Sequence, residues 1–210
     1  DQFGQYPDNS PTGIWIADRL RITRWVPAAG VYKIYGSDPT FPTLRPGDAF
    51  WVKSTKFWSG VSNTYDLEPF GEMVDQTQSY TLSLRRGWNQ FGSVFLQSVD
   101  WSNVQVIYGG EQMTLDAAAR AGRIRDYAWG YDGTQYFLVH ATINTTGVRR
   151  QLETWIGYWI RALADGCELV IPAPGSGGPP PPPGAAATDR FAPMGTIESA
   201  STLDSPPQAP

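Results

Sequence analysis

Residues 44–53, LRPGDAFWVK, align without a gap with residues 152–161, LETWIGYWIR. Leucine and tryptophan are identical in the two segments, and the pairs Ala/Gly, Phe/Tyr, Val/Ile and Lys/Arg match in kind. Aromatic and β-branched residues at this density are typical of a strand. The two segments therefore predict an internal repeat in which each copy closes with an aromatic strand.

Two shorter matches precede these segments in the same order. Residues 22–25 align with residues 124–127, and residues 12–17 align with residues 114–119. Because the order of the matched elements is kept, we expect two divergent tandem copies of one module.

The beginning of the chain is similar to the middle of a module. Residues 1–4, DQFG, align with residues 89–92, NQFG, which lie inside the predicted opening strand of the second copy. We therefore expect a first copy over residues 1–72 that lacks its opening strand, and a second copy over residues 78–172. On this interpretation the chain is a fragment of a longer protein.

Turn and cap signals define the elements of the second copy. An opening strand is predicted over residues 80–94, with a turn at Arg86-Gly87. A helix of about two turns follows, because Thr114 is a suitable N-cap, residues 117–119 are alanines and Gly122 is a suitable stop. Further strands are expected over residues 136–139 and 167–171, bounded by the turns Asp132-Gly133 and Asp165-Gly166.

The composition agrees with a β-rich protein. The 210 residues are 41% hydrophobic and 13% aromatic, with 22 glycines and 18 prolines to punctuate the connections. The expected fold class is all-β, mainly antiparallel and sandwich-like, with one short helix per repeat. A net charge of −4 gives no basic footprint for nucleic acid, and no apolar run is long enough for a membrane span.

The composition changes abruptly after Pro172. Residues 175–178 are rich in glycine, and five consecutive prolines follow at residues 179–183. Proline runs form an extended helix with little to bury. We interpret residues 173–210 as a disordered linker that ends in the start of a further segment.

Three segments of the second copy resemble a known bacterial module. Residues 84–95 contain Gly87-Trp88-Asn89, residues 129–132 read WGYD and residues 157–161 read GYWIR. This pattern resembles the all-β repeat modules of bacterial extracellular and cell-surface proteins, which have a Gly-Trp-Asn opening strand and a Gly-Tyr-Trp-Val closing strand. The first copy matches only in part, with AFWV at residues 49–52. The resemblance implies a secreted or surface location, neighbouring domains in a longer chain, and a non-catalytic structural or adhesive role.

The tryptophans are the candidate binding residues. Strand alternation places Trp159 on the face opposite Tyr158, and Trp51 occupies the matching position of the first copy. Each has a small residue two positions before it and a cation two positions after it. Such an indole either stacks on a sugar or packs against the other copy with the cation over its ring.

Trp58, Trp101 and Trp155 have no counterpart in the other copy and lie near predicted loops. They are therefore expected to be the more exposed aromatic side chains. With Trp51 and Trp159 they form a hypothetical carbohydrate-binding set, which is the alternative to a structural or adhesive role. The partner would then be a glycan, or otherwise another surface protein.

Little in the sequence favours catalysis. His140 is the only imidazole and closes an apolar strand, where a structural role is expected, and we predict no catalytic residues. The carboxylates are scattered without an acid/base spacing, so a hydrolase is the least favoured alternative.

Cofactors and metals are not expected either. Calcium could be bound through Asp100, Asp132 or Asp165, but no Asp-rich loop surrounds them, and we predict no metal site. The single cysteine, Cys167, cannot form an internal disulfide and is predicted to be a buried, inert thiol.

Overall fold

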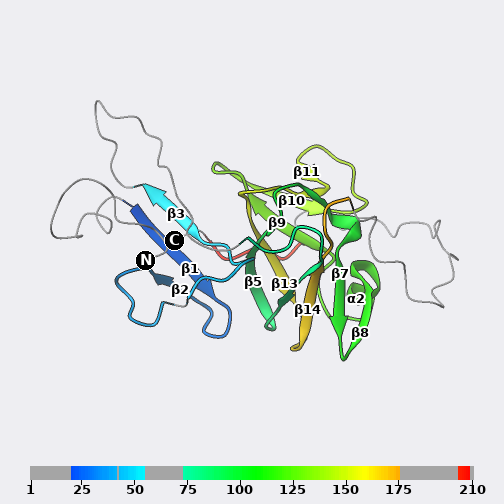
Figure 1. Ribbon diagram of the computed structural model, residues 1–210, viewed down its shortest axis with the longest axis horizontal. Coiled ribbons are helices and arrows are strands. Elements are labelled where there is room, and N and C mark those ends of the chain that lie inside the picture. The colour runs from blue at the N-terminus through cyan, green and yellow to red at the C-terminus, as the bar shows by residue number, and fades with distance from the viewer. Residues whose placement is uncertain (1–19, 42, 55–72, 176–202, 209–210) are drawn as a thin grey trace, which may run out of the picture.

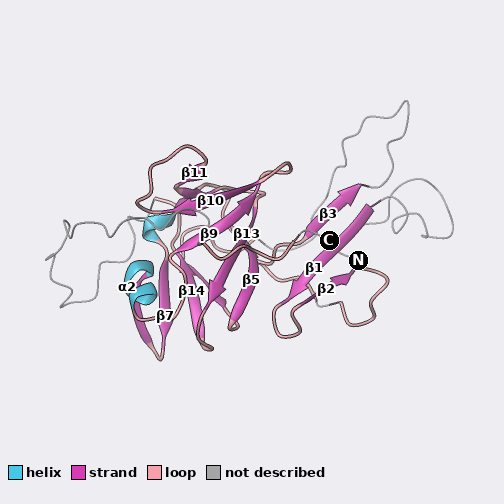
Figure 2. Cartoon of the chain, turned by 180° about the vertical axis from the view of Figure 1, so that it is seen from behind, coloured by secondary structure: helices cyan, strands magenta, loops and turns pink. Residues whose placement is uncertain are grey.

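The computed structural model describes residues 20–41, 43–54, 73–175 and 203–208, and strands dominate these residues (Figure 2). The predicted match of residues 1–4 and the candidate Trp58 lie outside the described residues. The strands are β1 (Leu20–Val26), β2 (Val31–Ile34), β3 (Trp51–Ser54), β4 (Tyr80–Ser83), β5 (Gly87–Gly92), β6 (Val99–Asp100), β7 (Gln105–Tyr108), β8 (Glu111–Thr114), β9 (Tyr127–Tyr131), β10 (Tyr136–His140), β11 (Val148–Arg149), β12 (Gln151–Leu152), β13 (Gly157–Ala162) and β14 (Cys167–Ile171). The helical elements are η1 (Trp101–Asn103) and α2 (Leu115–Arg120).

The strands form four sheets. The N-terminal sheet has the order β2-β1-β3, and the body, residues 73–175, contains a five-stranded sheet β11-β10-β9-β13-β5 and a four-stranded sheet β4-β14-β7-β8. A small sheet pairs β12 with β6. The strand pairs are antiparallel apart from β10 and β11. The prediction of a mainly antiparallel all-β fold is therefore confirmed, and the N-terminal sheet lies beside the body (Figure 1).

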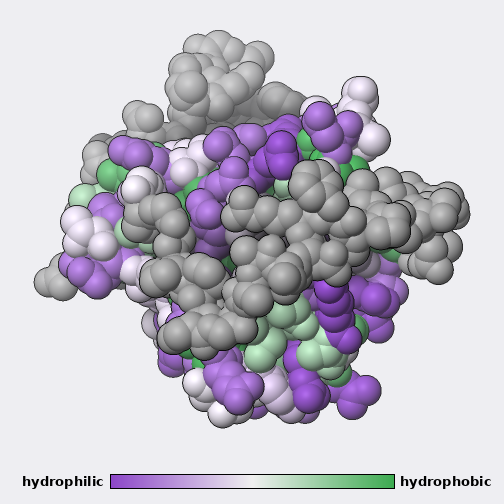
Figure 3. All heavy atoms as spheres, turned by 90° about the vertical axis from the view of Figure 1, so that its right-hand side faces the viewer, coloured by the Kyte–Doolittle hydropathy of each residue, from purple (hydrophilic) through white to green (hydrophobic). Residues whose placement is uncertain are grey.

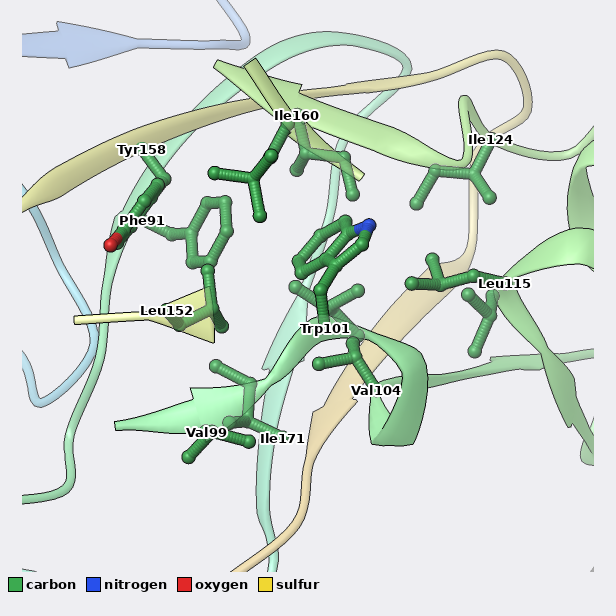
Figure 4. Close-up of a cluster of buried hydrophobic side chains, with 14 of the residues drawn as sticks. Phe91, Val99, Trp101, Val104, Leu115, Ile124, Leu152, Tyr158, Ile160 and Ile171 are labelled. Atoms are coloured by element: carbon green, nitrogen blue, oxygen red, sulfur yellow. The ribbon is translucent and has the colours of Figure 1, made fainter. Parts of the chain in front are cut away.

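The five-stranded and four-stranded sheets enclose one hydrophobic core. β13 contributes Tyr158 and Ile160, and β14 contributes Leu169 and Ile171. Trp101 lies in the middle of the cluster with no exposed surface (Figure 4). On the side of the body that carries β8 and α2, hydrophilic residues cover much of the described surface (Figure 3). The apolar surface of the body is thus concentrated between its two sheets.

The predicted helix forms as α2. The hydroxyl of Thr114 accepts a hydrogen bond from the backbone N–H of Ala117 at 3.2 Å, which satisfies an otherwise unpaired donor of the first turn. Gly122 follows the helix with a φ of +68°, a left-handed conformation that glycine adopts without a steric penalty. Among the described residues, no helix has the length and hydropathy needed to cross a membrane.

The predicted opening strand is instead two strands in different sheets. β4 pairs with β14 of the four-stranded sheet, whereas β5 pairs with β13 of the five-stranded sheet. The buried side chain of Asn89 holds the corner between them: its Oδ1 accepts from Arg85 N at 2.9 Å, and its Nδ2 donates to Arg85 O at 2.7 Å. Gly87 in this corner has a φ of +100°. The Gly-Trp-Asn motif therefore begins β5, directly after the corner at which the chain passes from one sheet to the other.

Cys167 is fully buried and free, as predicted. Its Sγ donates to the carbonyl oxygen of Arg123 at 3.4 Å, and burial raises the pKa of the thiol. A buried protonated thiol is a poor nucleophile, which agrees with a structural role for this residue.

The hairpin between β9 and β10 turns at Asp132, as predicted. One oxygen of the Asp132 carboxylate accepts from Thr134 N at 3.0 Å, from Thr134 Oγ1 at 2.7 Å and from Gln135 N at 3.0 Å. The hydrogen bond from the Thr134 hydroxyl, followed by those from the backbone, lowers the pKa of Asp132 to about 2. The charged carboxylate therefore stabilises the turn.

We expect Asp132→Asn to lower the stability of the chain at pH 6 but not near pH 2. The pKa of Asp132 is lowered in the folded state, so its contribution is present above the ordinary value of 3.8 and is lost as the pH falls toward about 2. Urea unfolding of both proteins between pH 6 and pH 2 measures the difference. Asp116→Asn, which removes an exposed ion pair with Arg120, is the control and should change stability little. A difference that stays constant with pH would contradict the prediction.

Candidate functional site

The outer face of the five-stranded sheet, on the side away from the core, is lined with aromatic side chains. Tyr127, Trp129 and Tyr131 alternate along β9 with Ala128 and Gly130. Ala128 belongs to the core, and a Cβ on Gly130 would collide with the ring of Phe137, which pairs with it from β10. Ala128 and Gly130 thus leave room for large core side chains on the inner face of β9. The aromatic side chains of β9 lie on its outer face.

The N-terminal sheet covers part of this outer face. The ring of Trp159 lies 5.7 Å from Trp25 and 6.3 Å from Tyr32, both in edge-to-face geometry, and Trp159 is 1% exposed. The ring of Trp51 lies 4.8 Å from Tyr131. Such pairs contribute about 0.5–1.5 kcal/mol each beyond the area they bury. We call the contact made by Trp25, Tyr32, Trp51, Tyr131, Tyr136 and Trp159 the aromatic interface.

Two hydrogen bonds from Trp25 fix the orientation of the N-terminal sheet at the aromatic interface. The indole of Trp25 donates to the carbonyl oxygen of Trp88 at 2.8 Å, and the backbone N–H of Trp25 donates to Oε1 of Gln90 at 3.2 Å. Both acceptors belong to β5, the edge strand of the five-stranded sheet. The N-terminal sheet is thus attached to the body by polar contacts as well as by apolar ones.

A second part of the outer face is occupied by Leu203–Gln208, which we call the C-terminal segment (red in Figure 1). The indole of Trp129 donates to the carbonyl oxygen of Asp204 at 2.9 Å, and the backbone N–H of Asp204 donates to the hydroxyl oxygen of Tyr127 at 3.0 Å. The hydroxyl of Tyr136 donates to the carbonyl oxygen of Pro207 at 3.2 Å. Side chains of β9 and β10 therefore hold the backbone of this segment.

Two arginines hold the Asp204 carboxylate. Its Oδ2 lies 2.8 Å from Nε of Arg125, and its Oδ1 lies 2.8 Å from Nη1 of Arg161. Arg125 and Arg161 are themselves neighbours, because the backbone N–H of Arg125 donates to the carbonyl oxygen of Arg161 at 2.9 Å. Two adjacent guanidinium groups repel each other unless an anion lies between them. The pair is therefore suited to binding a carboxylate.

The pKa values of Tyr127 and Tyr136 on the outer face are raised above the ordinary value of 10, so both hydroxyl groups are protonated at neutral pH. Burial raises the pKa of Tyr127, and burial together with Tyr32 and Tyr131 raises the pKa of Tyr136 to about 12. A protonated Tyr136 hydroxyl can donate to a carbonyl oxygen, as it does to Pro207. The hydrogen bonds of these two hydroxyl groups are thus independent of pH in the ordinary range.

A second candidate site is an open pocket of about 440 Å³ beside Trp155. Phe50, Val52 and Leu96 are among its lining residues, and Trp155 is 85% exposed. Trp155 also has a φ of +64°, a left-handed conformation that is strained for a residue with a side chain. Strain combined with an exposed aromatic ring is a feature of binding sites.

The predicted tryptophans have different environments. Trp155 is exposed, as predicted. The predicted exposure of Trp101 is wrong, because its indole is fully buried and donates to the carbonyl oxygen of Asp126 at 2.7 Å. Trp51 and Trp159 pack in the aromatic interface, which is the packing alternative, and Arg161 lies near the ring of Trp88, at 5.9 Å.

Both ring nitrogens of His140 have partners in the structure. Its Nδ1 accepts from the backbone N–H groups of Thr142 at 3.1 Å and Ile143 at 3.2 Å. Its Nε2 lies 3.4 Å from a carboxylate oxygen of Asp126, and this contact lowers the pKa of Asp126. Within the described ranges, His, Cys, Asp and Glu form no group of three that could hold a metal ion.

Sequence reasoning missed the residues that hold the C-terminal segment. The signal was present in residues 127–131, YAWGY, where an aromatic residue alternates with Ala or Gly. Such a strand has a small face and a large face, and the large face needs a cover. The position of Arg125 beside Arg161 could not be found in this way, because it depends on the pairing of distant segments.

The two candidate sites differ in what covers them. The outer face is covered by other residues of the same chain, whereas the pocket is open beside Trp155. The chain matches no family model, and comparisons with curated proteins and with solved structures give no match. Its function is therefore inferred from the geometry of these two sites.

Proposed function

We propose that the chain is a non-catalytic structural or adhesive module of a secreted or cell-surface bacterial protein, joined to neighbouring domains of a longer chain. The observation that carries this proposal is the aromatic interface, in which large rings from two sheets bury one another. Ionisable groups with a perturbed pKa also have structural partners: Asp126 contacts His140, and Asp132 binds its own turn. These arrangements favour a fixed shape over chemistry.

The proposal includes two divergent copies, over residues 1–72 and 78–172, followed by a linker. The disordered linker predicted over residues 173–210 is corrected at both ends, because Ala173 is buried in the core and Leu203–Gln208 contacts the five-stranded sheet. The order of strands supports the two copies. In the N-terminal sheet a hairpin of β1 and β2 is joined by β3, which pairs antiparallel with β1. In the five-stranded sheet a hairpin of β9 and β10 is joined by β13, which pairs antiparallel with β9. The aligned tryptophans belong to β3 and β13 and meet the same aromatic interface.

Protease treatment of intact bacterial cells that encode the chain tests its location. We expect tryptic peptides of this chain to be released from whole cells before any cytoplasmic marker protein is detected by mass spectrometry. Peptides found only after lysis would contradict a surface or secreted location.

Carbohydrate binding at Trp155 is the second candidate function. It is favoured by the exposed indole beside the open pocket, since a flat ring can stack on a sugar. A glycan array probed with the full chain should then give signals that Trp155→Ala abolishes. Silence of the array with the unaltered chain would leave the structural role as the better proposal.

A further inference from the structure

We propose that the outer face of the five-stranded sheet is a binding site for extended peptides in which an aspartate is followed by prolines, and that Leu203–Gln208 is its occupant in this chain. Three sets of contacts carry the proposal: those to the carboxylate, to the backbone and to the prolines. The inference does not depend on the cellular location proposed above.

The first set recognises the charge of the ligand. Arg125 and Arg161 approach different oxygens of the Asp204 carboxylate, each at 2.8 Å. Hydrogen bonds between ionised groups are stronger than neutral ones, and an arginine pair distinguishes a carboxylate from an amide because an amide presents one acceptor and one donor. The Asp204 side chain is 23% exposed, so the contact is partly shielded from water. Asparagine at this position should therefore bind poorly.

The second set fixes the register of the ligand. Asp204 uses its backbone N–H toward Tyr127 and its carbonyl oxygen toward Trp129, so both of its main-chain groups are bound. These partners are large, rigid side chains on the same strand, two residues apart. A backbone held at both its donor and its acceptor cannot slide along the strand without breaking both bonds.

The third set suits proline. Pro206 and Pro207 are half-buried, and Pro207 presents its carbonyl oxygen to the hydroxyl of Tyr136. Proline has no backbone N–H, so it can lie against an aromatic surface without leaving a donor unpaired. Proline-rich peptides are also pre-extended and lose little entropy on docking, which is why aromatic-lined grooves bind them. Within the sequence Asp-Ser-Pro-Pro, Asp204 and Pro207 thus make the hydrogen bonds to the face. Pro206 lies between them in the chain and is half-buried, whereas Gln208 is exposed.

The C-terminal segment is a tethered ligand. A segment joined to its own site by a chain of this length has an effective concentration on the order of millimolar, so a free peptide competes with it poorly. Weakening the tethered copy should therefore open the site to a peptide in solution. This property makes the proposal testable with the full chain.

The test measures binding of the blocked peptide LDSPPQ, the sequence of residues 203–208, to the full chain and to its Asp204→Asn variant. By fluorescence anisotropy we expect the labelled peptide to bind Asp204→Asn at least about tenfold more tightly than the unaltered chain, since loss of a charge-assisted contact corresponds to roughly that factor or more. A peptide with Asn in place of Asp should bind the variant about tenfold more weakly. Equal binding of both peptides would overturn the carboxylate recognition.

The arginines are tested in the Asp204→Asn background. Arg161→Gln and Arg125→Gln should each weaken peptide binding by about tenfold or more, whereas Arg120→Gln, on the exposed surface of α2, should leave it unchanged. Circular dichroism checks that each variant is folded. Unchanged affinity in both folded arginine variants would overturn the site.

A second readout detects release of the C-terminal segment directly in the folded chain. The Trp129 indole N–H should give an NMR resonance that moves when Asp204→Asn releases the segment and returns when the peptide is added. Identical resonances in the unaltered chain and in Asp204→Asn would overturn the proposal. A dimer that dissociates on Asp204→Asn would also overturn the assignment within one chain, because a second copy would then be the occupant.

Discussion

Trp159→Ala is expected to detach the N-terminal sheet from the body. Trp159 is 1% exposed and touches the rings of both Trp25 and Tyr32, so its removal leaves a void at the centre of the aromatic interface. Truncation of a buried aromatic side chain costs about 3–5 kcal/mol, which is a large part of the stability of a typical domain. Hydrogen exchange followed by mass spectrometry should show that Trp159→Ala accelerates exchange in β1, β2 and β3, relative to the unaltered chain, more than it does in β7 and β14.

Trp155→Ala is the matched control for this experiment. It removes the same side chain from a position only four residues away, but Trp155 is 85% exposed, and such a change should alter the free energy of unfolding by less than about 0.5 kcal/mol. Tyr32→Ala removes a ring that the N-terminal sheet contributes to the aromatic interface, and it changes no residue of the body. If Trp159→Ala and Tyr32→Ala are no less stable than Trp155→Ala, the interface does not hold the sheets together.

Trp101→Ala is expected to unfold the body itself. Its indole has no exposed surface, lies among the core side chains of both sheets and donates to the carbonyl oxygen of Asp126 at 2.7 Å (Figure 4). The cavity left by Trp101→Ala should lower the free energy of unfolding by about 3–5 kcal/mol. An unpaired buried carbonyl adds roughly 1–3 kcal/mol. Urea unfolding should show a chain that is largely unfolded or strongly destabilised.

Trp101→Phe separates the two contributions. It keeps most of the apolar volume but removes the N–H donor, so its loss of stability should fall between those of the unaltered chain and Trp101→Ala. In contrast to Trp159→Ala, both variants should raise hydrogen exchange in β7 and β14. Faster hydrogen exchange confined to the N-terminal sheet in these two variants would contradict the central position of Trp101 in the core.

Local signals predicted local structure well. Thr114 and Gly122 define α2 because a cap and a left-handed stop act within a few residues, and the turn at Asp132 follows from the same kind of chemistry. Residues 167–171 form the predicted strand β14. The sequence could not show that β4 and β5 enter different sheets, because strand pairing joins segments that are far apart in the chain.

The candidate site was less predictable for the same reason. Trp101 follows a short strand and has the local features of a loop residue, yet the η1 turn directs it into the core. The binding of Asp204 needs Arg125, Arg161 and Trp129 to come together from separate segments. The aromatic alternation in residues 127–131 is a signal that the sequence does contain, but it does not identify the segment that covers the face.

The position of the C-terminal segment has a mechanical consequence. If the chain is stretched by its neighbours in a longer protein, tension applied through Gln208 loads the contacts of Asp204 before it reaches the strands of the body. Rupture of those contacts would release the C-terminal segment and extend the chain without unfolding the core. Single-molecule stretching should record this extension as an early, low-force step that Asp204→Asn removes. The contacts of Arg125 and Arg161 with Asp204 would then break under tension and form again when the tension falls.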